Sequence, residues 1–166
     1  MTTKKLTYMA LLTAVALIIF VIEAQIPSPI PVPGVKLGLA NIITVFAMFR
    51  LKPKETFLIL VCRILLGAVF AGQMMTLLYS FCGGMCCFFL MLLMRRIVTE
   101  EQIWVCSVAG AMAHNLGQLA AAMAVVKTFG LIVYLPVLMV SGMLAGAFTG
   151  FCAQYLLKHL KKLGTY

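Results

Sequence analysis

The polar side chains best suited to bind a ligand lie inside an apolar stretch, within the segment AHNLGQL (113–119). His114, Asn115 and Gln118 interrupt the run 103–126, which is otherwise apolar and long enough to cross a bilayer. Imidazole and amide groups donate and accept hydrogen bonds, so this set suits the recognition of a small polar molecule. His114 and Gln118 are four residues apart and share one helix face, so the alternative is a hydrogen bond between these two side chains.

No set of residues in the sequence predicts catalysis. The chain contains no Asp, and its four acidic residues are the scattered Glu23, Glu55, Glu100 and Glu101. Enzymes that bind Mg²⁺ and diphosphate need clustered carboxylate oxygens, which this pattern does not provide. The sequence contains no Walker motif for ATP binding. The six cysteines lie in apolar runs and are interpreted as small hydrophobic residues. The alternative for those at positions 82–87 is a thiolate cluster. We therefore expect no enzymatic activity, no cofactor and no metal.

The composition indicates what kind of scaffold positions these groups. Of the 166 residues, 64% are hydrophobic and 10% are charged, whereas a soluble domain has about a quarter of its residues charged. The chain is therefore predicted to be an all-α integral membrane protein with one domain, residues 1–166, folded as a compact bundle of about six transmembrane helices. The predicted spans are 6–26, 35–50, 56–72, 74–94, 103–126 and 131–157.

The basic residues predict the orientation of the chain in the membrane. Ten of the thirteen lie beside the termini or in the connections after the second and fourth spans, namely Lys4, Lys5, Arg50, Lys52, Lys54, Arg95, Arg96, Lys158, Lys161 and Lys162. The opposite side has only Lys36 and Lys127, and Arg63 lies within the third span. Because short cytoplasmic loops are enriched in Lys and Arg, both termini are predicted to be cytoplasmic in a bacterial inner (plasma) membrane. This bias accounts for the net charge of +9, so nucleic acid is not an expected partner.

Polar residues within the predicted spans collect between the membrane midplane and the outer side. Asn41, Arg63, His114 and Gln118 all lie in this half, and such groups in hydrocarbon face a cavity or one another. One interpretation is an outward-facing pocket lined by these four side chains. The other is structural pairing between helices, for example of Arg63 with Glu23.

The first outer connection is unusually rich in proline. The segment IPSPIPVPGVK (26–36) holds four of the six prolines, which stiffen an extended backbone. It is interpreted either as a lid over the pocket or as a rigid connector. Lys36, Lys127 and Arg63 together favour a ligand that carries an anionic group.

Small residues recur at intervals of four in three of the predicted spans, a spacing that lets helix backbones approach closely. Two of these series predict internal helix packing, and their members are Ala109, Ala113, Gly117 and Ala121, and Gly142, Gly146 and Gly150. The third is the pair Ala10 and Ala14 near the cytoplasmic end of the first span. This pair serves either internal packing or the docking of another membrane subunit.

The segments PGVKLGLANI (33–42) and AHNLGQL (113–119) resemble the family called Gx transporter, or heptaprenyl diphosphate synthase component I. That family is similar in turn to the substrate-binding S components of energy-coupling factor (ECF) transporters. The resemblance implies six helices, cytoplasmic termini, and docking through Ala10 and Ala14 onto a transmembrane coupling subunit that works with ATPases. It also implies a ligand site that includes Lys36, Asn41, His114, Asn115 and Gln118.

Two functions follow from this resemblance. The primary hypothesis is a membrane substrate-binding or transport subunit that captures a small, anionic or amphipathic ligand from the outer side. The alternative is a non-catalytic accessory subunit in prenyl diphosphate or quinone biosynthesis, or in membrane electron transfer.

Overall fold

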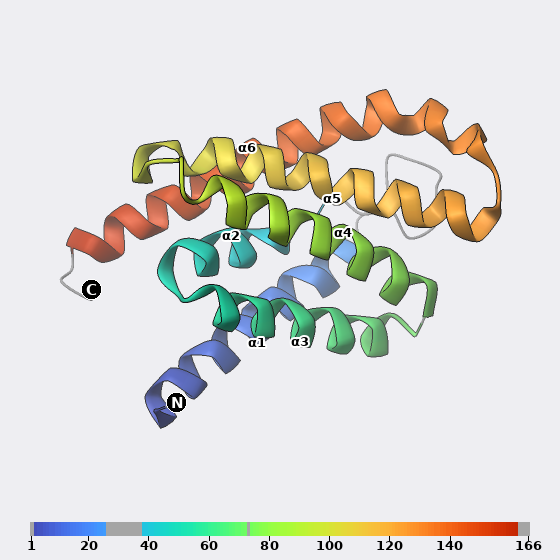
Figure 1. Cartoon of the computed structure of the whole chain (residues 1–166). Helices are drawn as coiled ribbons and strands as arrows, with labels where there is room; N and C mark the ends of the chain where they lie inside the picture. Colours follow the sequence, from blue (N-terminus) through green and yellow to red (C-terminus); the bar gives the residue numbers. More distant parts are fainter. Residues whose placement is uncertain (1, 26–37, 73, 163–166) are drawn as a thin grey trace.

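The computed structural model describes residues 2–25, 38–72 and 74–162, and every regular element within these ranges is helical (Figure 1). The six α-helices are α1 (Thr3–Gln25), α2 (Asn41–Arg50), α3 (Pro53–Ala71), α4 (Met74–Met94), α5 (Ile103–Val126) and α6 (Leu135–Lys162). Two short 3-10 helices, η1 (Glu100–Gln102) and η2 (Phe129–Tyr134), precede α5 and α6. The prediction of an all-helical chain with six main helices is confirmed.

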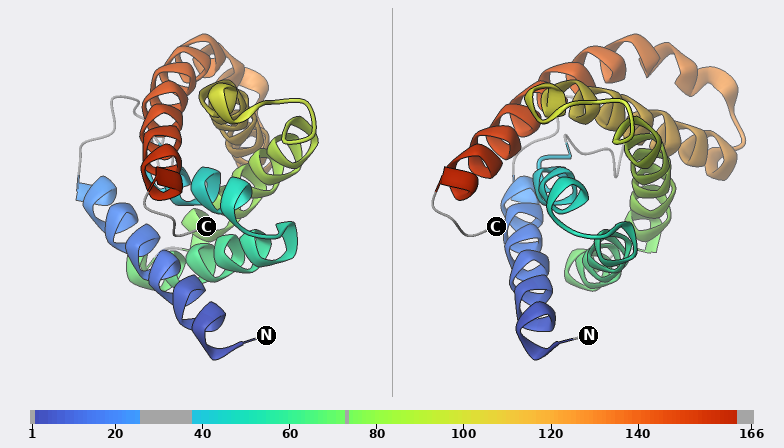
Figure 2. Two further views of the ribbon diagram at one scale, coloured as in Figure 1. Left: turned by 90° about the vertical axis from the view of Figure 1, so that its left-hand side faces the viewer. Right: turned by 60° about the vertical axis from the view of Figure 1, so that its left-hand side comes forward.

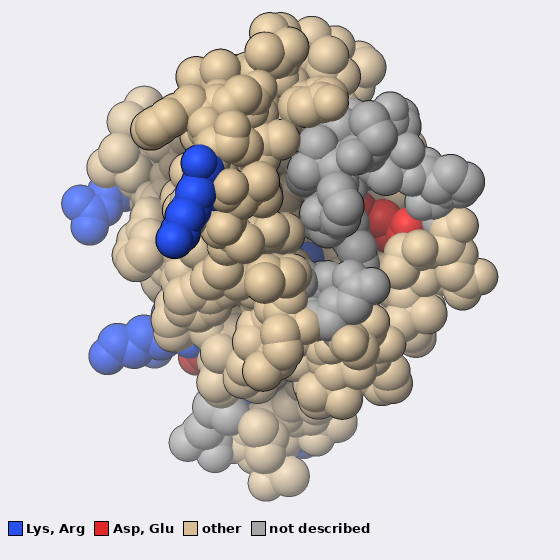
Figure 3. Space-filling view, turned by 90° about the vertical axis from the view of Figure 1, so that its right-hand side faces the viewer, with Lys and Arg blue, Asp and Glu red and all other residues tan. Residues whose placement is uncertain are grey.

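Three helical segments of the described chain are long and apolar enough to cross a membrane, namely Thr3–Gln25, Leu77–Met94 and Phe129–Lys162. Helices α3 and α5 have 19 and 24 residues, but polar side chains interrupt both of them. Large hydrophobic side chains lie on the outside of the molecule, with Phe129, Met74 and Val69 among the most exposed. Charged side chains are few on the face shown in Figure 3. These features fit a membrane protein, while six complete crossings stay a prediction.

The shortest α-helix, α2, occupies the centre of the molecule (Figure 2). It contacts each of the other five α-helices, and seven of its ten residues are buried. Apart from Asn41 and Thr44, its sequence NIITVFAMFR is apolar around the whole helix until the final Arg50, which is the pattern expected of a helix enclosed on all sides. Its central place allows its first turn to reach side chains from α1, α3 and α5.

The start of α2 differs from the prediction of a span over 35–50. The helix begins at Asn41, and the described residues before it form a turn in which Gly38 has a φ of 82°. This left-handed conformation suits glycine, which lacks a Cβ atom. The first three positions of the predicted span lie outside the described residues. The late start has a physical reason, because a carboxylate from α1 binds the amides of this turn, as described below.

Glycines hold α5 tightly between α4 and α6. A Cβ atom added to Gly146 would lie 2.7 Å from the Val108 Cα, and one added to Gly150 would lie 2.6 Å from the Trp104 Cα. On the opposite side, a Cβ atom on Gly117 would lie 2.8 Å from the carbonyl oxygen of Cys82 in α4. The predicted close packing through small residues is therefore confirmed for both helices. It fixes the rotation of α5 and so the direction in which its polar side chains point.

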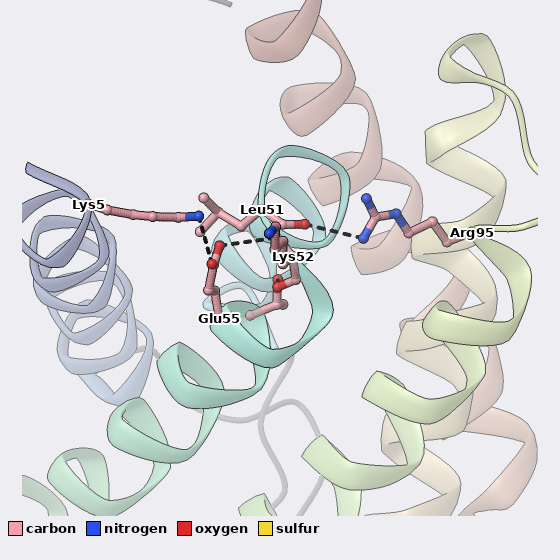
Figure 4. Close-up of polar contacts among 6 residues, drawn as sticks. Lys5, Leu51, Lys52, Glu55 and Arg95 are labelled. Atoms are coloured by element: carbon pink, nitrogen blue, oxygen red, sulfur yellow. Dashed lines mark hydrogen bonds and ion pairs between the residues drawn. The ribbon is translucent and has the colours of Figure 1, made fainter. Parts of the chain in front are cut away.

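One end of the molecule gathers residues that the charge pattern assigned to the cytoplasmic side (Figure 4). The Lys5 Nζ lies 2.7 Å from a carboxylate oxygen of Glu55, and the other oxygen of Glu55 accepts a bond from the backbone N–H of Lys52 at 3.1 Å. Arg95 donates from Nη1 to the carbonyl oxygen of Leu51 at 3.2 Å. The start of α1, the α2–α3 connection and the end of α4 thus lie together, as the predicted topology requires.

Candidate functional site

A small polar cavity lies where five helices converge. Its volume is about 20 Å³, which is room for about one water molecule. The described residues that line it are Phe20, Glu23, Gly38, Ala40, Asn41, Arg63, Ile64, Ser80, His114 and Gln118. The structure therefore brings together four residues that the sequence placed in a common pocket: Asn41, Arg63, His114 and Gln118.

Glu23 closes the side of the cavity formed by α1 and the first turn of α2. Its carboxylate accepts a hydrogen bond from the backbone N–H of Gly38 at 2.5 Å and a longer one from that of Ala40 at 3.4 Å. The side chain is buried. A carboxylate is favoured at this position because the N-terminus of a helix has unpaired N–H groups and a partial positive charge. Backbone amides of the turn before α2 are thus bound by a carboxylate of the chain itself.

Arg63 places a permanent positive charge in the middle of the bundle. The residue is only 6% exposed, and its Nη2 donates to Oδ1 of Asn41 at 3.2 Å. Its Nε has no hydrogen-bond partner among the described residues. The ion pair between Arg63 and Glu23 that the sequence suggested is not formed. Arg63 binds the Asn41 side chain, and Glu23 binds backbone amides.

His114 and Gln118 extend from α5 toward the same cavity. His114 Nδ1 and Gln118 Oε1 are buried, and neither has a partner in the part of the chain that the structure describes. The alternative bond between these two side chains is therefore not formed. Gly83 of α4 makes room for both, because a Cβ atom there would lie 2.8 Å from the Gln118 Cγ and 3.1 Å from the His114 Cε1.

Asn115, another predicted ligand residue, does not line the cavity. Asn115 is buried at the contact between α5 and α6, where its Nδ2 donates to the carbonyl oxygen of Leu138 at 2.6 Å. The structure places it away from the cavity and gives it a role in joining two helices. Lys36 and the proline-rich segment 26–36 lie outside the described residues.

Several lining residues were not selected from the sequence as site residues. Glu23 was considered only as a structural partner of Arg63, although it is the one acidic residue within an apolar span. Ser80 and Gly38 gave no signal of their own. Gly83 does not line the cavity but lies against His114 and Gln118, and it belongs to a pair of adjacent glycines in an apolar helix, which is a detectable sign of close packing.

The predicted docking residues Ala10 and Ala14 are both exposed on α1. They line a groove of about 340 Å³ between α1 and α3, whose other lining residues are Leu6, Met9, Thr13, Leu17, Leu58, Ile59, Cys62 and Leu66. Neither alanine is buried in the described chain. Both are therefore not enclosed between helices of the described chain.

The model of the heptaprenyl diphosphate synthase component I family matches residues 12–156 of the 166. The chain therefore belongs to this family. No curated protein and no solved structure matched it. All the lining residues of the cavity fall within the matched range.

Proposed function

We propose that this member of the heptaprenyl diphosphate synthase component I family is a non-catalytic membrane subunit that binds a small polar ligand for transport. One observation carries the proposal: three buried polar atoms without partners in the described chain, Arg63 Nε, His114 Nδ1 and Gln118 Oε1, border one cavity. Leaving a buried donor or acceptor unsatisfied costs about 1–3 kcal/mol. A purely structural cluster would avoid this cost by pairing its members, whereas a binding site uses such atoms to hold its ligand.

The site also joins the two sequence segments that mark the family resemblance. Gly38 and Asn41 come from segment 33–42, while His114 and Gln118 come from segment 113–119. The described cavity is much smaller than pockets that enclose organic ligands, which are about 300–1,000 Å³. Binding of an organic ligand therefore requires the described helices around the cavity to separate. Helix α1 is the natural element to move, because its main contacts in the described chain are with α3 and α2.

The proposed transport role includes a membrane partner. Ala10 and Ala14 lie on an exposed apolar groove where a helix of another membrane subunit can approach the α1 backbone closely. We propose that this partner is a transmembrane coupling subunit energised by ATPases, as in ECF transporters. The proposed orientation has both termini in the cytoplasm and the end of the molecule drawn in Figure 4 at the cytoplasmic face.

The family description favours a second candidate, a non-catalytic accessory subunit of a prenyl diphosphate synthase. In that role Arg63 would meet the diphosphate of a prenyl compound. The two candidates therefore differ in the chemical class of the molecule that reaches the cavity.

Native mass spectrometry of the protein purified in lipid nanodiscs tests the proposal. The wild-type protein should carry a bound small molecule, and Gln118→Leu should carry much less of it. Thr149→Val is the matched control, because Thr149 is a buried polar residue that bonds Ser107 at 3.0 Å, away from the cavity. Equal occupancy in all three proteins, or no bound molecule in any, would contradict the binding role. A bound prenyl diphosphate would favour the accessory role.

A further inference from the structure

The described lining of the cavity contains one negatively charged and one positively charged side chain. Glu23 and Arg63 are 5% and 6% exposed, and they are the only charged side chains among the described residues that line it, with His114 counted as neutral. The two side chains form no ion pair, but they line the same small cavity, so their opposite charges attract each other. An isolated charge in a poorly solvated site is strongly unfavourable, so the carboxylate serves as the counter-charge of the guanidinium.

A ligand with a net negative charge would upset this balance. It would meet Arg63, but it would also bring a second negative charge close to Glu23, which cannot leave without releasing the amides of Gly38 and Ala40. Repulsion between like charges increases as the effective dielectric constant falls, and the site is enclosed by five helices. Multiply charged groups such as diphosphate are disfavoured most.

The buried atoms without partners indicate which hydrogen-bond donors and acceptors the ligand must have. Arg63 Nε is a donor and needs an acceptor, while Gln118 Oε1 is an acceptor and needs a donor. His114 Nδ1 also has no partner in the described chain, and it is a second acceptor when the ring proton is on the other nitrogen. A polar group that matches these atoms has two hydrogen-bond donors and one acceptor. Three examples are a primary amide, an amine next to a hydroxyl, and an ammonium group next to a carboxylate.

On the basis of the proposed function, we infer that the polar group of the ligand is neutral overall or zwitterionic, and that Glu23 is the residue that sets this specificity by excluding anions. The inference replaces the anionic ligand expected from the basic residues of the sequence. It also separates the two candidate functions, because a prenyl diphosphate does not fit a site that already contains a carboxylate.

Anion binding by a variant without the Glu23 charge tests this inference. Glu23→Gln keeps the shape of the side chain but leaves Arg63 without its counter-charge. Acetate and inorganic diphosphate, without added metal and at constant ionic strength, serve as probes, and the midpoint of thermal unfolding of the full-length protein is the readout. Neither probe should stabilise the wild type. Both should stabilise Glu23→Gln, with a half-maximal concentration about tenfold lower than for any effect on the wild type.

Two controls sharpen the result. Glu55→Gln removes a carboxylate that pairs with Lys5 far from the cavity, so it should respond to the probes as the wild type does. The double variant Glu23→Gln with Arg63→Gln restores neutrality and should lose the response to anions. If Glu23→Gln alone does not fold, the double variant should fold, and its failure to do so would count against the charge balance.

Stabilisation of the wild type by diphosphate would overturn the inference, as would an equal response of Glu23→Gln and Glu55→Gln. A co-purified ligand whose polar group has a net charge would also overturn it. Failure of the proposed function is a different result, namely no bound molecule in the wild type. In that case the responses of the Glu23 variants still decide whether this carboxylate excludes anions.

Discussion

The guanidinium of Arg63 donates from Nη2 to Oδ1 of Asn41 across 3.2 Å, which ties a buried charge in α3 to the first residue of α2. The bond orients the guanidinium while its Nε remains available on the cavity side. Any change of the charge or hydrogen bonding around Arg63 therefore acts directly on the first turn of α2. Because the backbone amides of Gly38 and Ala40, in the turn just before α2, bind Glu23, this stretch of chain connects Arg63 to the end of α1.

Replacement of Asn41 by Leu should destabilise the protein and weaken ligand binding together. It removes the acceptor of a charged donor, and hydrogen bonds to charged groups contribute about 1.5–3 kcal/mol. Asn41→Asp retains an acceptor oxygen toward Arg63 and should keep more of the stability. Thermal unfolding followed by the fluorescence of Trp104, the single tryptophan, measures both variants. Equal stability of Asn41→Leu and the wild type would show that the bond contributes little.

Replacement of Gln118 by Leu should separate binding from stability. Gln118 Oε1 has no partner in the described protein, so its removal breaks no known bond and should leave the unfolding midpoint unchanged or raised. Ligand affinity should fall by about threefold to a hundredfold, the equivalent of one lost hydrogen bond. Asn115→Leu should do the reverse, because it loses the 2.6 Å bond to Leu138 that joins α5 and α6. Normal affinity in Gln118→Leu would remove this residue from the site.

Replacement of Gly83 by Ala should disturb the site through shape alone. The added Cβ atom would lie 2.8 Å from both the Gln118 Cγ and the His114 carbonyl oxygen. Because the second of these is a backbone atom, α4 and α5 must separate, and movement of the Gln118 side chain alone is not enough. We expect lower affinity and a lower unfolding midpoint. Gly130→Ala is the matched control, because the nearest atom to its new Cβ is 3.5 Å away. Unchanged binding by Gly83→Ala would mean that the packing at this position is loose.

The sequence predicted α4 and α5 well because the limits of their apolar runs are clear, whereas the predicted span 131–157 begins four residues before α6 and ends five residues before its last residue, Lys162. Predicted spans 74–94 and 103–126 coincide with α4 and α5, and Arg95 marks the end of the first. The start of α2 could not be predicted in this way. It depends on backbone amides that bind a carboxylate 15 and 17 residues earlier in the chain, and such contacts leave no periodic pattern.

The sequence allowed the membrane depth of the site residues to be predicted, but not the direction of each side chain or its contacts. Asn41, Arg63, His114 and Gln118 could be grouped because all are polar residues at similar depth in apolar helices. Asn115 was grouped with them although it follows His114 directly and so points about 100° away around the helix. That direction faces α6, where Gly142 leaves space for its amide. Helical phase could have separated these two neighbours, whereas the role of Glu23 required the three-dimensional structure.

Acidification should weaken the contact between α1 and α3 at the end shown in Figure 4. The hydrogen bond from the Lys5 ammonium lowers the pKa of Glu55 below its ordinary value of 4.5. A lowered carboxyl pKa stabilises the folded protein at pH values above 4.5, and this contribution is lost as the pH falls through the lowered value. The stability difference between wild type and Glu55→Gln should therefore be constant near neutral pH and vanish on acidification. A difference that grows on acidification would contradict this assignment.

Bulky substitutions on α1 should uncouple the protein from its proposed membrane partner without unfolding it. Ala10 and Ala14 are exposed on an apolar groove, so the indole ring of Ala10→Trp or Ala14→Trp has space in the isolated protein. The same ring would prevent a second helix from approaching the α1 backbone, which requires small side chains. Ile18→Trp is the control, because Ile18 is 58% exposed on the same helix but does not line the groove. Co-purification with a co-expressed candidate coupling subunit should fall for the two alanine variants and not for Ile18→Trp, while all three unfold near the wild-type temperature. Equal recovery of the complex with all three variants would show that the groove is covered by lipid and not by a partner helix.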